Sequence, residues 1–360
     1  MTDLRVKVHQ SVRNDFSLAV DFVAPSDSVT ALLGASGSGK TSVLDAIAGL
    51  RSDISQAEIS CGEEVWSDPG NNVENWKRPL AYVFQDARLF PHLNVRENIE
   101  YARVRASGDT VSVDDLCNWL ALDGLMDRAP GHLSAGQQQR VAIARALANG
   151  PRILLLDEPL ANLDHAAAEA CLDCLKRVRA ELKLPMVYVS HRIEEVCEIA
   201  DHIVLLDDGR TTHSGPIVDI LGRLDTSLVE NPSAASVLLA KRRRWDEQYA
   251  LTECEVAGQT LWLSQELDAS NGATCRIRVP ARDVSICREA PDQSSILNIL
   301  PVEISEFSTV GNAHVLLRLM LGEQVLLARI TCKSFDQLAL KIGEQVYAQI
   351  KSTALIKESS

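Results

Sequence analysis

GASGSGKT, at residues 34–41, matches the pattern G-x-x-x-x-G-K-[ST] of a phosphate-binding (Walker A) loop. Its glycines let consecutive backbone N–H groups curve around phosphate oxygens. Lys40 supplies a cation for the outer phosphates, and Thr41 supplies a hydroxyl for magnesium. The predicted nucleotide-binding residues are Gly34, Ala35, Ser36, Gly37, Ser38, Gly39, Lys40 and Thr41.

The segments on both sides of this loop fit its assignment. VTALL at 29–33 is an apolar run typical of a buried strand. The stretch 41–50 carries Val43, Leu44, Ile47 and Leu50 at helical spacing. The loop is therefore predicted to open a helix whose N-terminal dipole faces the phosphates.

ILLLDEP at 153–159 is typical of a Walker B strand. Its unbroken apolar run fits a parallel strand covered on both faces. Asp157 at the strand end is placed to hold magnesium, and Glu158 to polarise the attacking water. Taken alone, the pair also fits an acidic turn after a strand, but the Walker A loop favours the catalytic interpretation.

LSAGQ at 133–137 begins a third motif. Ser134 and Gln137 form a Ser-x-x-Gln capping box, and an apolar stripe follows at helical spacing. The segment resembles the signature motif of ABC-type ATPases, with Ala135 where Gly is commoner. The resemblance implies that Ser134, Ala135, Gly136 and Gln137 contact the γ-phosphate held by the Walker A loop of a second copy.

Three more segments agree with this family, in the family's order along the chain. Gln85 in YVFQD resembles the Q-loop residue, which contacts magnesium and the attacking water. Residues 161–164 (ANLD), ending in Asp164, resemble the D-loop, and His191 in YVSHR resembles the switch histidine. The resemblance implies that Glu158, His191 and Gln85 are catalytic. It also implies that Thr41, Gln85 and Asp157 hold magnesium, and that ATP and Mg²⁺ are the cofactors.

Composition excludes several other classes of protein. A hydrophobic content of 46% is too high for a disordered chain. A net charge of −13 and a pI near 5.1 argue against a nucleic-acid-binding surface. Cys171 and Cys174 form the only close pair among nine cysteines, and their helical spacing favours core packing over a metal or redox site.

The chain shows neither a signal peptide nor a membrane span. MTDLRVKVHQ at the start lacks an apolar core, and no run of about 18 apolar residues occurs. We therefore expect a protein in the cytosol.

Two domains are expected from the length of the chain. Strand-like runs alternate with helical ones from residue 4 to about 223, with a helical insertion between Gln85 and Leu133. Residues 225–249, which include the basic run 241–244, are predicted to be a solvated linker or helix face, with contact to anionic lipid as the alternative. Beyond residue 250 the apolar period becomes two, which predicts a small β-barrel or sandwich.

Three segments, two of them in the C-terminal third, narrow the family further. VFQDARLFPHLNVREN (83–98), RIRVPARDVSI (276–286) and SSILNILPVEI (294–304) resemble the molybdate-importer ATPases, whose tail is an oxyanion-binding Mop domain. The matching oxyanion candidates are Ser294, Ser295, Asn298, Lys351 and Ser352. Leu297 stands where that family often has Arg, which removes a bidentate donor.

The expected architecture is an α/β P-loop domain of the ABC type with a helical subdomain, followed by an OB-like barrel. Its boundaries are 1–232 for the ATPase, 233–290 for a linker and the start of the β domain, and 291–357 for the Mop-like part. Phe16 is the candidate for stacking on adenine, although its apolar ring equally fits the core.

The family resemblance implies the partners and the location. They are a second copy, two permease subunits that dock near residues 87–98, and a periplasmic molybdate-binding protein, all at the cytoplasmic face of the inner membrane. Two alternatives stay open: an importer of sulfate, ferric iron or polyamines, and a soluble ABC ATPase of DNA repair or translation.

Overall fold

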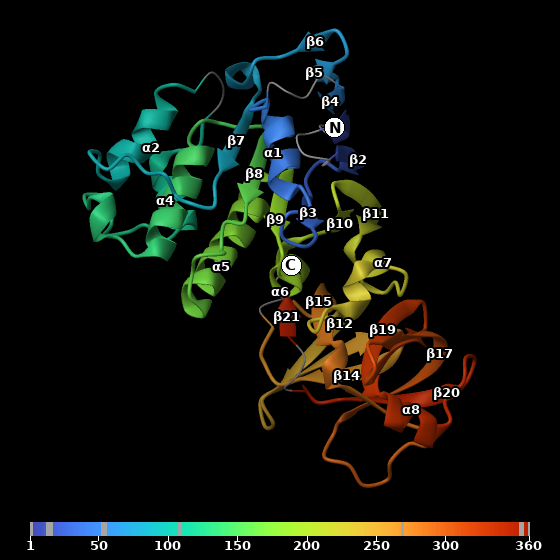
Figure 1. Ribbon diagram of the computed structural model, residues 1–360. Helices are drawn as coiled ribbons and strands as arrows, with labels where there is room; N and C mark the ends of the chain where they lie inside the picture. Colours follow the sequence, from blue (N-terminus) through green and yellow to red (C-terminus); the bar gives the residue numbers. More distant parts are fainter. Residues whose placement is uncertain are drawn as a thin grey trace. The chain divides into compact units, whose positions relative to one another are not determined.

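The computed structural model describes residues 3–11, 17–51, 56–106, 110–267, 270–352 and 356–358. Contacts divide the chain into two units, residues 1–214 and 215–360 (Figure 1). The three domain boundaries expected from the sequence stay predictions. Phe16, the candidate for stacking on adenine, lies outside the described residues.

A mixed β-sheet organises the first unit. In the described residues it has eleven strands in the order β6-β5-β4-β1-β2-β11-β10-β3-β9-β8-β7. The strands are β1 (Leu4–Ser11), β2 (Ser17–Ala24), β3 (Val29–Leu33), β4 (Ala57–Cys61), β5 (Glu64–Asp68), β6 (Asn71–Asn72), β7 (Leu80–Val83), β8 (Ile153–Asp157), β9 (Met186–Ser190), β10 (His202–Asp207) and β11 (Arg210–Pro216).

The sheet has a parallel part and an antiparallel part. Strands β10, β3, β9, β8 and β7 pair in parallel, and β3, β8 and β9 are buried at every residue. Both runs at 29–33 and 153–157 are therefore confirmed as core strands. Strands β1, β2, β4, β5 and β6 pair antiparallel, so the expected alternation of strand and helix fails from β1 to β2 and from β4 to β6, where no helix separates the strands in the described part of the chain.

The helices of this unit are α1 (Lys40–Ala48), α2 (Val95–Arg103), α3 (Val113–Trp119), α4 (Ala135–Leu147), α5 (His165–Leu182) and α6 (Ile193–Ile199), with 3-10 turns η1 (Asn75–Lys77) and η2 (Pro130–His132). Figure 1 shows α2 and α4 in one lobe beside β7. The helical insertion expected between Gln85 and Leu133 is thus confirmed.

Helix α1 ends earlier than its apolar spacing predicts. Gly49 adopts a left-handed φ of 70° as the C-cap, so Leu50 follows the helix and is 47% exposed. The buried guanidinium of Arg78 donates to the carbonyls of Ala46 at 3.1 Å and Ile47 at 2.6 Å. This cation stabilises the negative end of the helix dipole, and it ties α1 to the turn before β7.

The predicted core position of the cysteine pair is confirmed. Cys171 and Cys174 lie on α5 with buried side chains, and burial raises the pKa of the Cys171 thiol to about 12. Within the described ranges, no group of three or more His, Cys, Asp or Glu residues is arranged to hold a metal ion.

The second unit consists mainly of two five-stranded sheets. One has the order β14-β13-β12-β15-β21, and the other has the order β16-β20-β17-β18-β19. The strands are β12 (Ala235–Asp246), β13 (Leu251–Val256), β14 (Gln259–Leu263), β15 (Thr274–Pro280), β16 (Val284–Cys287), β17 (Asn298–Val310), β18 (His314–Leu321), β19 (Gln324–Thr331), β20 (Gln345–Ile350) and β21 (Ile356–Glu358). Shorter helical elements are α7 (Ile217–Leu221), η3 (Ser227–Glu230), η4 (Ala281–Asp283) and α8 (Cys332–Leu338).

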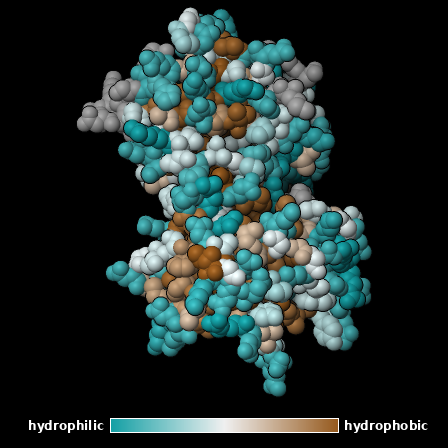
Figure 2. Space-filling view, turned by 90° about the vertical axis from the view of Figure 1, so that its right-hand side faces the viewer, coloured by the Kyte–Doolittle hydropathy of each residue, from teal (hydrophilic) through white to brown (hydrophobic). Residues whose placement is uncertain are grey.

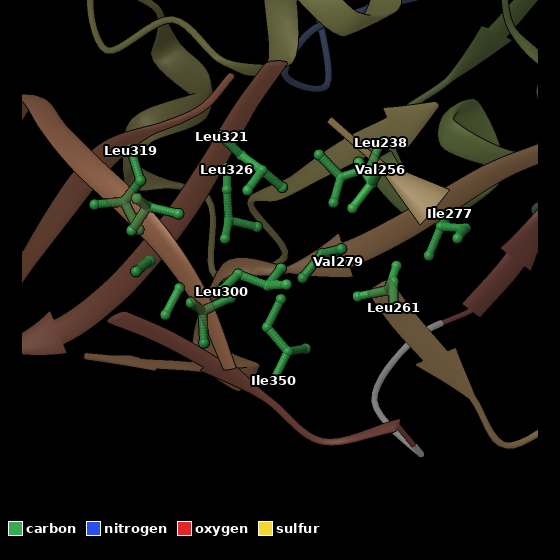
Figure 3. Packing of buried hydrophobic residues seen from close by; sticks show 14 of the residues in the cluster. Leu238, Val256, Leu261, Ile277, Val279, Leu300, Leu319, Leu321, Leu326 and Ile350 are labelled. Atoms are coloured by element: carbon green, nitrogen blue, oxygen red, sulfur yellow. The ribbon is translucent and has the colours of Figure 1, made fainter. Parts of the chain in front are cut away.

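The period-two residues of both sheets form one apolar core. Ile277 and Val279 of β15 face Leu300 of β17 and Ile350 of β20 in this core (Figure 3). On the face drawn in Figure 2, hydrophilic residues cover most of the surface and hydrophobic ones form small patches. The predicted β domain is confirmed.

The linker or helix face expected over residues 225–249 is wrong for the part that contains the basic run 241–244. Residues 235–246 form β12, which pairs with both β13 and β15. A register shift between Arg242 and Arg244 interrupts the alternation of apolar and polar residues, which hides this strand in the sequence. Arg243 pairs with Glu255, and Arg244 lies 2.6 Å from Glu253. These two glutamates of β13 offset part of the positive charge of the basic run.

Among the described residues, no helix is both long and apolar enough to cross a membrane.

Candidate nucleotide-binding site

A polar cavity of about 580 Å³ opens where the Walker A loop leaves β3 and enters α1. Its lining consists of Ser36, Gly37, Gly39, Lys40, Thr41, Ser42, Gln85 and Glu158. Gly39 has a φ of 96°, a conformation that side chains disfavour. A Cβ atom at Gly34 would lie 2.3 Å from the carbonyl oxygen of Leu206, so the loop packs closely against β10. The structure thus brings residues from three of the sequence motifs, the Walker A loop, Gln85 and the Walker B strand, to one site.

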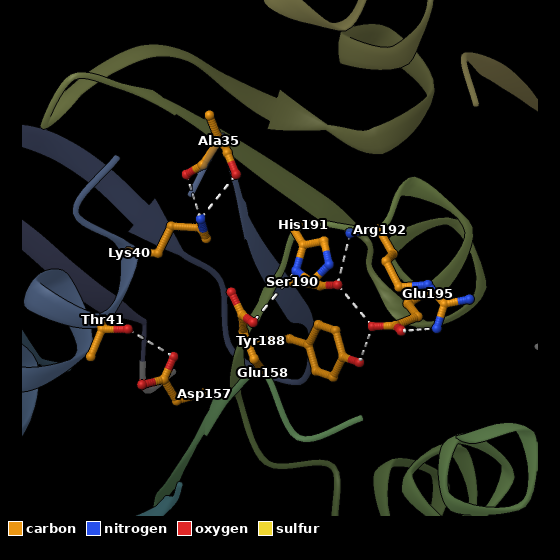
Figure 4. Close-up of polar contacts among 11 residues, drawn as sticks. Ala35, Lys40, Thr41, Asp157, Glu158, Tyr188, Ser190, His191, Arg192 and Glu195 are labelled. Atoms are coloured by element: carbon orange, nitrogen blue, oxygen red, sulfur yellow. Dashed lines mark hydrogen bonds and ion pairs between the residues drawn. The ribbon is translucent and has the colours of Figure 1, made fainter. Parts of the chain in front are cut away.

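The ammonium of Lys40 is held by its own loop. Its Nζ donates to the carbonyls of Gly34 at 2.9 Å and Ala35 at 2.8 Å (Figure 4). Burial lowers the pKa of Lys40, and the carboxylates of Glu158 and Asp157 offset this in part. The loop therefore holds a partly desolvated cation where the outer phosphates of a nucleotide would lie.

Asp157 at the end of β8 has both carboxylate oxygens in hydrogen bonds. Thr41 donates to Oδ1 at 3.2 Å, and the hydroxyl of Tyr82 donates to Oδ2 at 3.1 Å. Burial raises the pKa of Asp157, while these two donors lower it. A hydroxyl and a carboxylate are oxygen ligands of the kind that Mg²⁺ takes, so the residues fit that ion.

Tyr82 is a further residue of the site, which none of the sequence motifs predicts. Its hydroxyl lies 3.3 Å from Asp45 of α1 as well as 3.1 Å from Asp157. Burial and these carboxylates raise the pKa of Tyr82, which keeps the phenol neutral as a donor. Tyr82 is the first residue of the segment YVFQD, but only the pairing of β7 with β8 places it beside Asp157.

Glu158 and His191 meet at the carboxyl ends of β8 and β9. His191 Nδ1 lies 3.4 Å from Glu158 Oε2 (Figure 4). The backbone of Glu158 has a φ of 45°, and its N–H donates to the carbonyl of Val189 at 3.1 Å. Strained non-glycine residues of this kind are concentrated at functional sites.

The predicted cap of the signature helix is confirmed. Ser134 accepts a hydrogen bond from the backbone of Gln137, whose side chain accepts one from the backbone of Ser134. Ser134 and Ala135 are exposed, while Gly136 packs where a Cβ atom would lie 2.9 Å from Ala167 of α5. None of the four signature residues lines the described cavity of the same chain.

Asp164 caps helix α5. Its carboxylate accepts from the backbone N–H of Ala167 at 2.9 Å. Because Ala167 also contacts the signature glycine, the D-loop candidate and the signature motif lie next to each other.

Two polar side chains of α4, the buried Gln139 and the partly buried Arg145, hold the backbone around Gln85. The amide of Gln139 donates to the carbonyl of Phe84 at 3.3 Å. The guanidinium of Arg145 donates to the carbonyls of Ala87 at 3.1 Å and Arg88 at 2.9 Å. Neither residue is predicted from the sequence, because the apolar stripe of a helix gives no signal for the polar residues that lie beside it.

The oxyanion candidates of the second unit are only partly brought together. Asn298 is buried, and its amide donates to Ser352 Oγ at 3.4 Å. The same amide accepts from the backbone N–H of Trp262 at 2.7 Å and donates to its carbonyl at 2.9 Å. Ser294, Ser295 and Lys351 are exposed, and Leu297 is 54% exposed. The side-chain amide of Asn298 is thus already hydrogen-bonded to the backbone of Trp262 in β14.

The fold and this site define an ABC-type ATPase. A family model described as ABC transporter matches residues 18–161, and the TOBE domain model matches residues 294–356. The dimeric structure of MJ0796, a bacterial ABC transporter cassette, has a TM-score of 0.51 and 26% identity. That likeness covers 59% of this chain and 98% of the cassette.

Similarity to curated proteins extends over nearly the whole chain. The molybdenum import ATP-binding protein ModC of Aromatoleum aromaticum is 44% identical over 95% of this chain and 91% of its own length. ModC of Thiobacillus denitrificans is 45% identical over 95% of this chain and 94% of its own length. The chain belongs to the family of molybdenum import ATP-binding proteins.

The chain is therefore an enzyme that binds and hydrolyses ATP in the service of transport. ABC cassettes form dimers and work with membrane permease subunits.

Proposed function

We propose that the chain is the ATP-hydrolysing subunit of a molybdate importer. Two copies would pair with two permease subunits and receive molybdate from a periplasmic binding protein. The complex would lie at the inner membrane, with this chain bound peripherally at the cytoplasmic face. The observation that carries the proposal is the 44% identity to a molybdenum import protein over 95% of the chain, which includes the second unit. The ATPase half alone does not distinguish molybdate from sulfate, ferric iron or polyamines.

A groove on the first unit supports an importer over a soluble ABC ATPase. A cavity of about 320 Å³ is bounded by β7, α2 and α4. Phe84, Phe90 and Tyr101 contribute aromatic rings to its lining, and Arg145 packs over Phe90. An apolar groove rimmed by cations suits an amphipathic helix. We assign it to the permease, because it adjoins the segment 87–98 and the backbone of Gln85.

The phosphate site would use the loop and the residues that face it. Backbone N–H groups of residues 34–41 and the ammonium of Lys40 would bind the β- and γ-phosphates. Thr41, Asp157 and Gln85 would hold Mg²⁺, which supplies positive charge to the phosphate oxygens when bound. Tyr82 orients the carboxylate of Asp157 for this role.

Glu158 would act as the general base. It accepts a proton from water as the water oxygen bonds to the γ-phosphorus and the bond to the bridging oxygen breaks, which yields ADP and phosphate. His191 would hold the carboxylate of Glu158 and contact the γ-phosphate; its Nδ1 lies 3.4 Å from that carboxylate. Ser134, Ala135, Gly136 and Gln137 of a second copy would complete the site, with Asp164 beside them.

The substrate assignment is tested in cells. Deleting the gene for this chain is expected to abolish high-affinity molybdate uptake and the activity of molybdenum-cofactor enzymes. Excess external molybdate should restore both through a low-affinity route, and so should the wild-type gene, whereas a Lys40→Ala copy should not. Uptake of labelled molybdate at nanomolar and millimolar concentrations is the measurement. Loss of sulfate or iron uptake with intact molybdoenzymes would contradict the assignment.

We further propose that the second unit binds molybdate weakly. Ser294, Ser295, Asn298, Lys351 and Ser352 would supply hydroxyl, amide and ammonium donors, and the contact between Asn298 and Ser352 supports this grouping. Leu297 lacks the charge-assisted hydrogen bond of an arginine, worth about 1.5–3 kcal/mol, or one to two orders of magnitude in Kd.

Leu297→Arg in the full chain is therefore expected to tighten molybdate binding by about ten- to a hundredfold in calorimetry. Leu239→Arg is the matched control, because Leu239 is also exposed, at 42%, and lies on β12. Absence of heat for both the wild type and Leu297→Arg at millimolar molybdate would leave the unit as an assembly element.

A further inference from the structure

Glu195 on α6 contacts the residues on both sides of His191. Its Oε2 accepts from the hydroxyl of Ser190 at 2.8 Å, and its Oε1 lies 3.0 Å from Nη1 of Arg192 (Figure 4). The hydroxyl of Ser190 also accepts from the backbone N–H of Arg192 at 3.0 Å. One carboxylate thus joins the last residue of β9 to the first turn of α6 across His191.

The carboxylate is itself fixed in the core. The side chain of Glu195 is 9% exposed, and its Oε2 also accepts from the hydroxyl of Tyr188 at 3.0 Å. Tyr188 is fully buried in β9, and burial raises its pKa well above the ordinary value, so the phenol donates in the neutral form. Two hydrogen bonds to Oε2 and the ion pair between Oε1 and Arg192 favour a single orientation of this buried carboxylate.

Among the residues that the structure describes, no buried side chain is seen to hold the imidazole of His191 in this way. Its imidazole is 52% exposed and lies 3.4 Å from the carboxylate of Glu158. The position of an exposed ring depends on its backbone, because the side chain has few packing contacts to hold it. In this loop the side chains of Ser190 and Arg192 contact Glu195, and the hydroxyl of Ser190 also accepts from the backbone N–H of Arg192.

We propose that Glu195 is a positioning residue that holds the loop of His191 in the place where the imidazole meets Glu158. The proposal rests on the role proposed above for His191. Glu195 touches neither Glu158 nor the cavity lining in the described residues, so its effect passes through Ser190 and Arg192. Displacement of a catalytic group by about 1 Å can cost a hundredfold in rate.

The substitution Glu195→Gln keeps the shape and replaces one oxygen by a donor that faces Arg192. We expect kcat for ATP hydrolysis to fall by about tenfold or more, while the Kd for a fluorescent ATP analogue changes by less than about twofold. In a His191→Ala background the same substitution should lower kcat no further, since its effect passes through the imidazole.

Glu198→Gln is the matched control. Glu198 lies on the same helix and pairs with Lys176 at 2.9 Å, away from the loop of His191. We expect it to leave kcat within about twofold of the wild type. Ser190→Ala should reproduce the loss seen in Glu195→Gln, and Ser190→Thr, which retains the hydroxyl, should restore turnover.

Hydrogen exchange supplies a measurement that does not depend on turnover. Amides of residues 190–192 should exchange faster in Glu195→Gln, with unchanged protection in β3 and β8. An equal loss of kcat in the His191→Ala background, or unchanged exchange at 190–192, would overturn the proposal. Full turnover in His191→Ala alone would refute the role of His191 instead, and the exchange result would still decide whether Glu195 holds the loop.

Discussion

Glu158→Gln is expected to lower ATP turnover by about a hundredfold or more while ATP stays bound. Glutamine keeps the shape of the side chain and cannot take a proton from water. The Walker A loop, Lys40 and Thr41 are unchanged, so the binding site for the phosphates persists. The variant should therefore accumulate as an ATP-bound dimer, which gel filtration with and without ATP measures.

Lys40→Ala is the contrasting variant. It removes the ammonium that the loop holds at 2.8–2.9 Å from the carbonyls of Gly34 and Ala35. Binding of a fluorescent ATP analogue should be lost together with ATP-dependent dimerisation. Near-normal turnover in Glu158→Gln would remove that residue from the role of general base.

Ser134→Arg is expected to abolish hydrolysis without loss of ATP binding to the single chain. The signature residues do not line the described cavity of their own chain, and Ser134 is exposed at the start of α4. Each ATP would therefore need the signature of a second copy. An arginine at position 134 would block the approach of the signature residues to the ATP of the second copy. For the same reason, ATP hydrolysis by the wild type should rise steeply with protein concentration or require the permease.

Mixing inactive chains tests this arrangement directly. A dimer of Lys40→Ala with Ser134→Arg has one site with both defects and one site with neither. Mixing the two variants should restore ATP hydrolysis, with at most one intact site in each mixed dimer. Neither variant should be active alone. Full wild-type activity from Ser134→Arg alone would exclude a site shared between two copies.

Short-range patterns were enough to predict the ATPase elements. The runs at 29–33 and 153–157 form buried strands, because an unbroken apolar stretch is stable only with both faces covered. Ser134 caps α4 because its hydroxyl and the side chain of Gln137 lie within one turn of each other. In each case the residues that decide the structure are close together in the sequence.

Contacts between residues far apart in the sequence determine the features that the sequence patterns did not predict. Residues 235–246 are a strand because β13 and β15 pair with them, although consecutive charges and a register shift hide the alternation. The side chain of Asn298 forms hydrogen bonds with the backbone of Trp262, 36 residues away in the sequence. The residue type alone therefore did not predict its hydrogen-bond partner.

The sequence by itself determined the class of enzyme, the phosphate-binding loop and the acidic residues opposite it, because these depend on residue type at fixed local spacing. The tertiary structure decided which side chains support them. Tyr82 of β7 reaches Asp157 of the neighbouring strand β8, and Gln139 of α4 reaches Phe84 just after β7. Such polar contacts leave no periodic pattern in the sequence. A buried polar group needs a hydrogen-bond partner, and only the fold determines which partner lies near it.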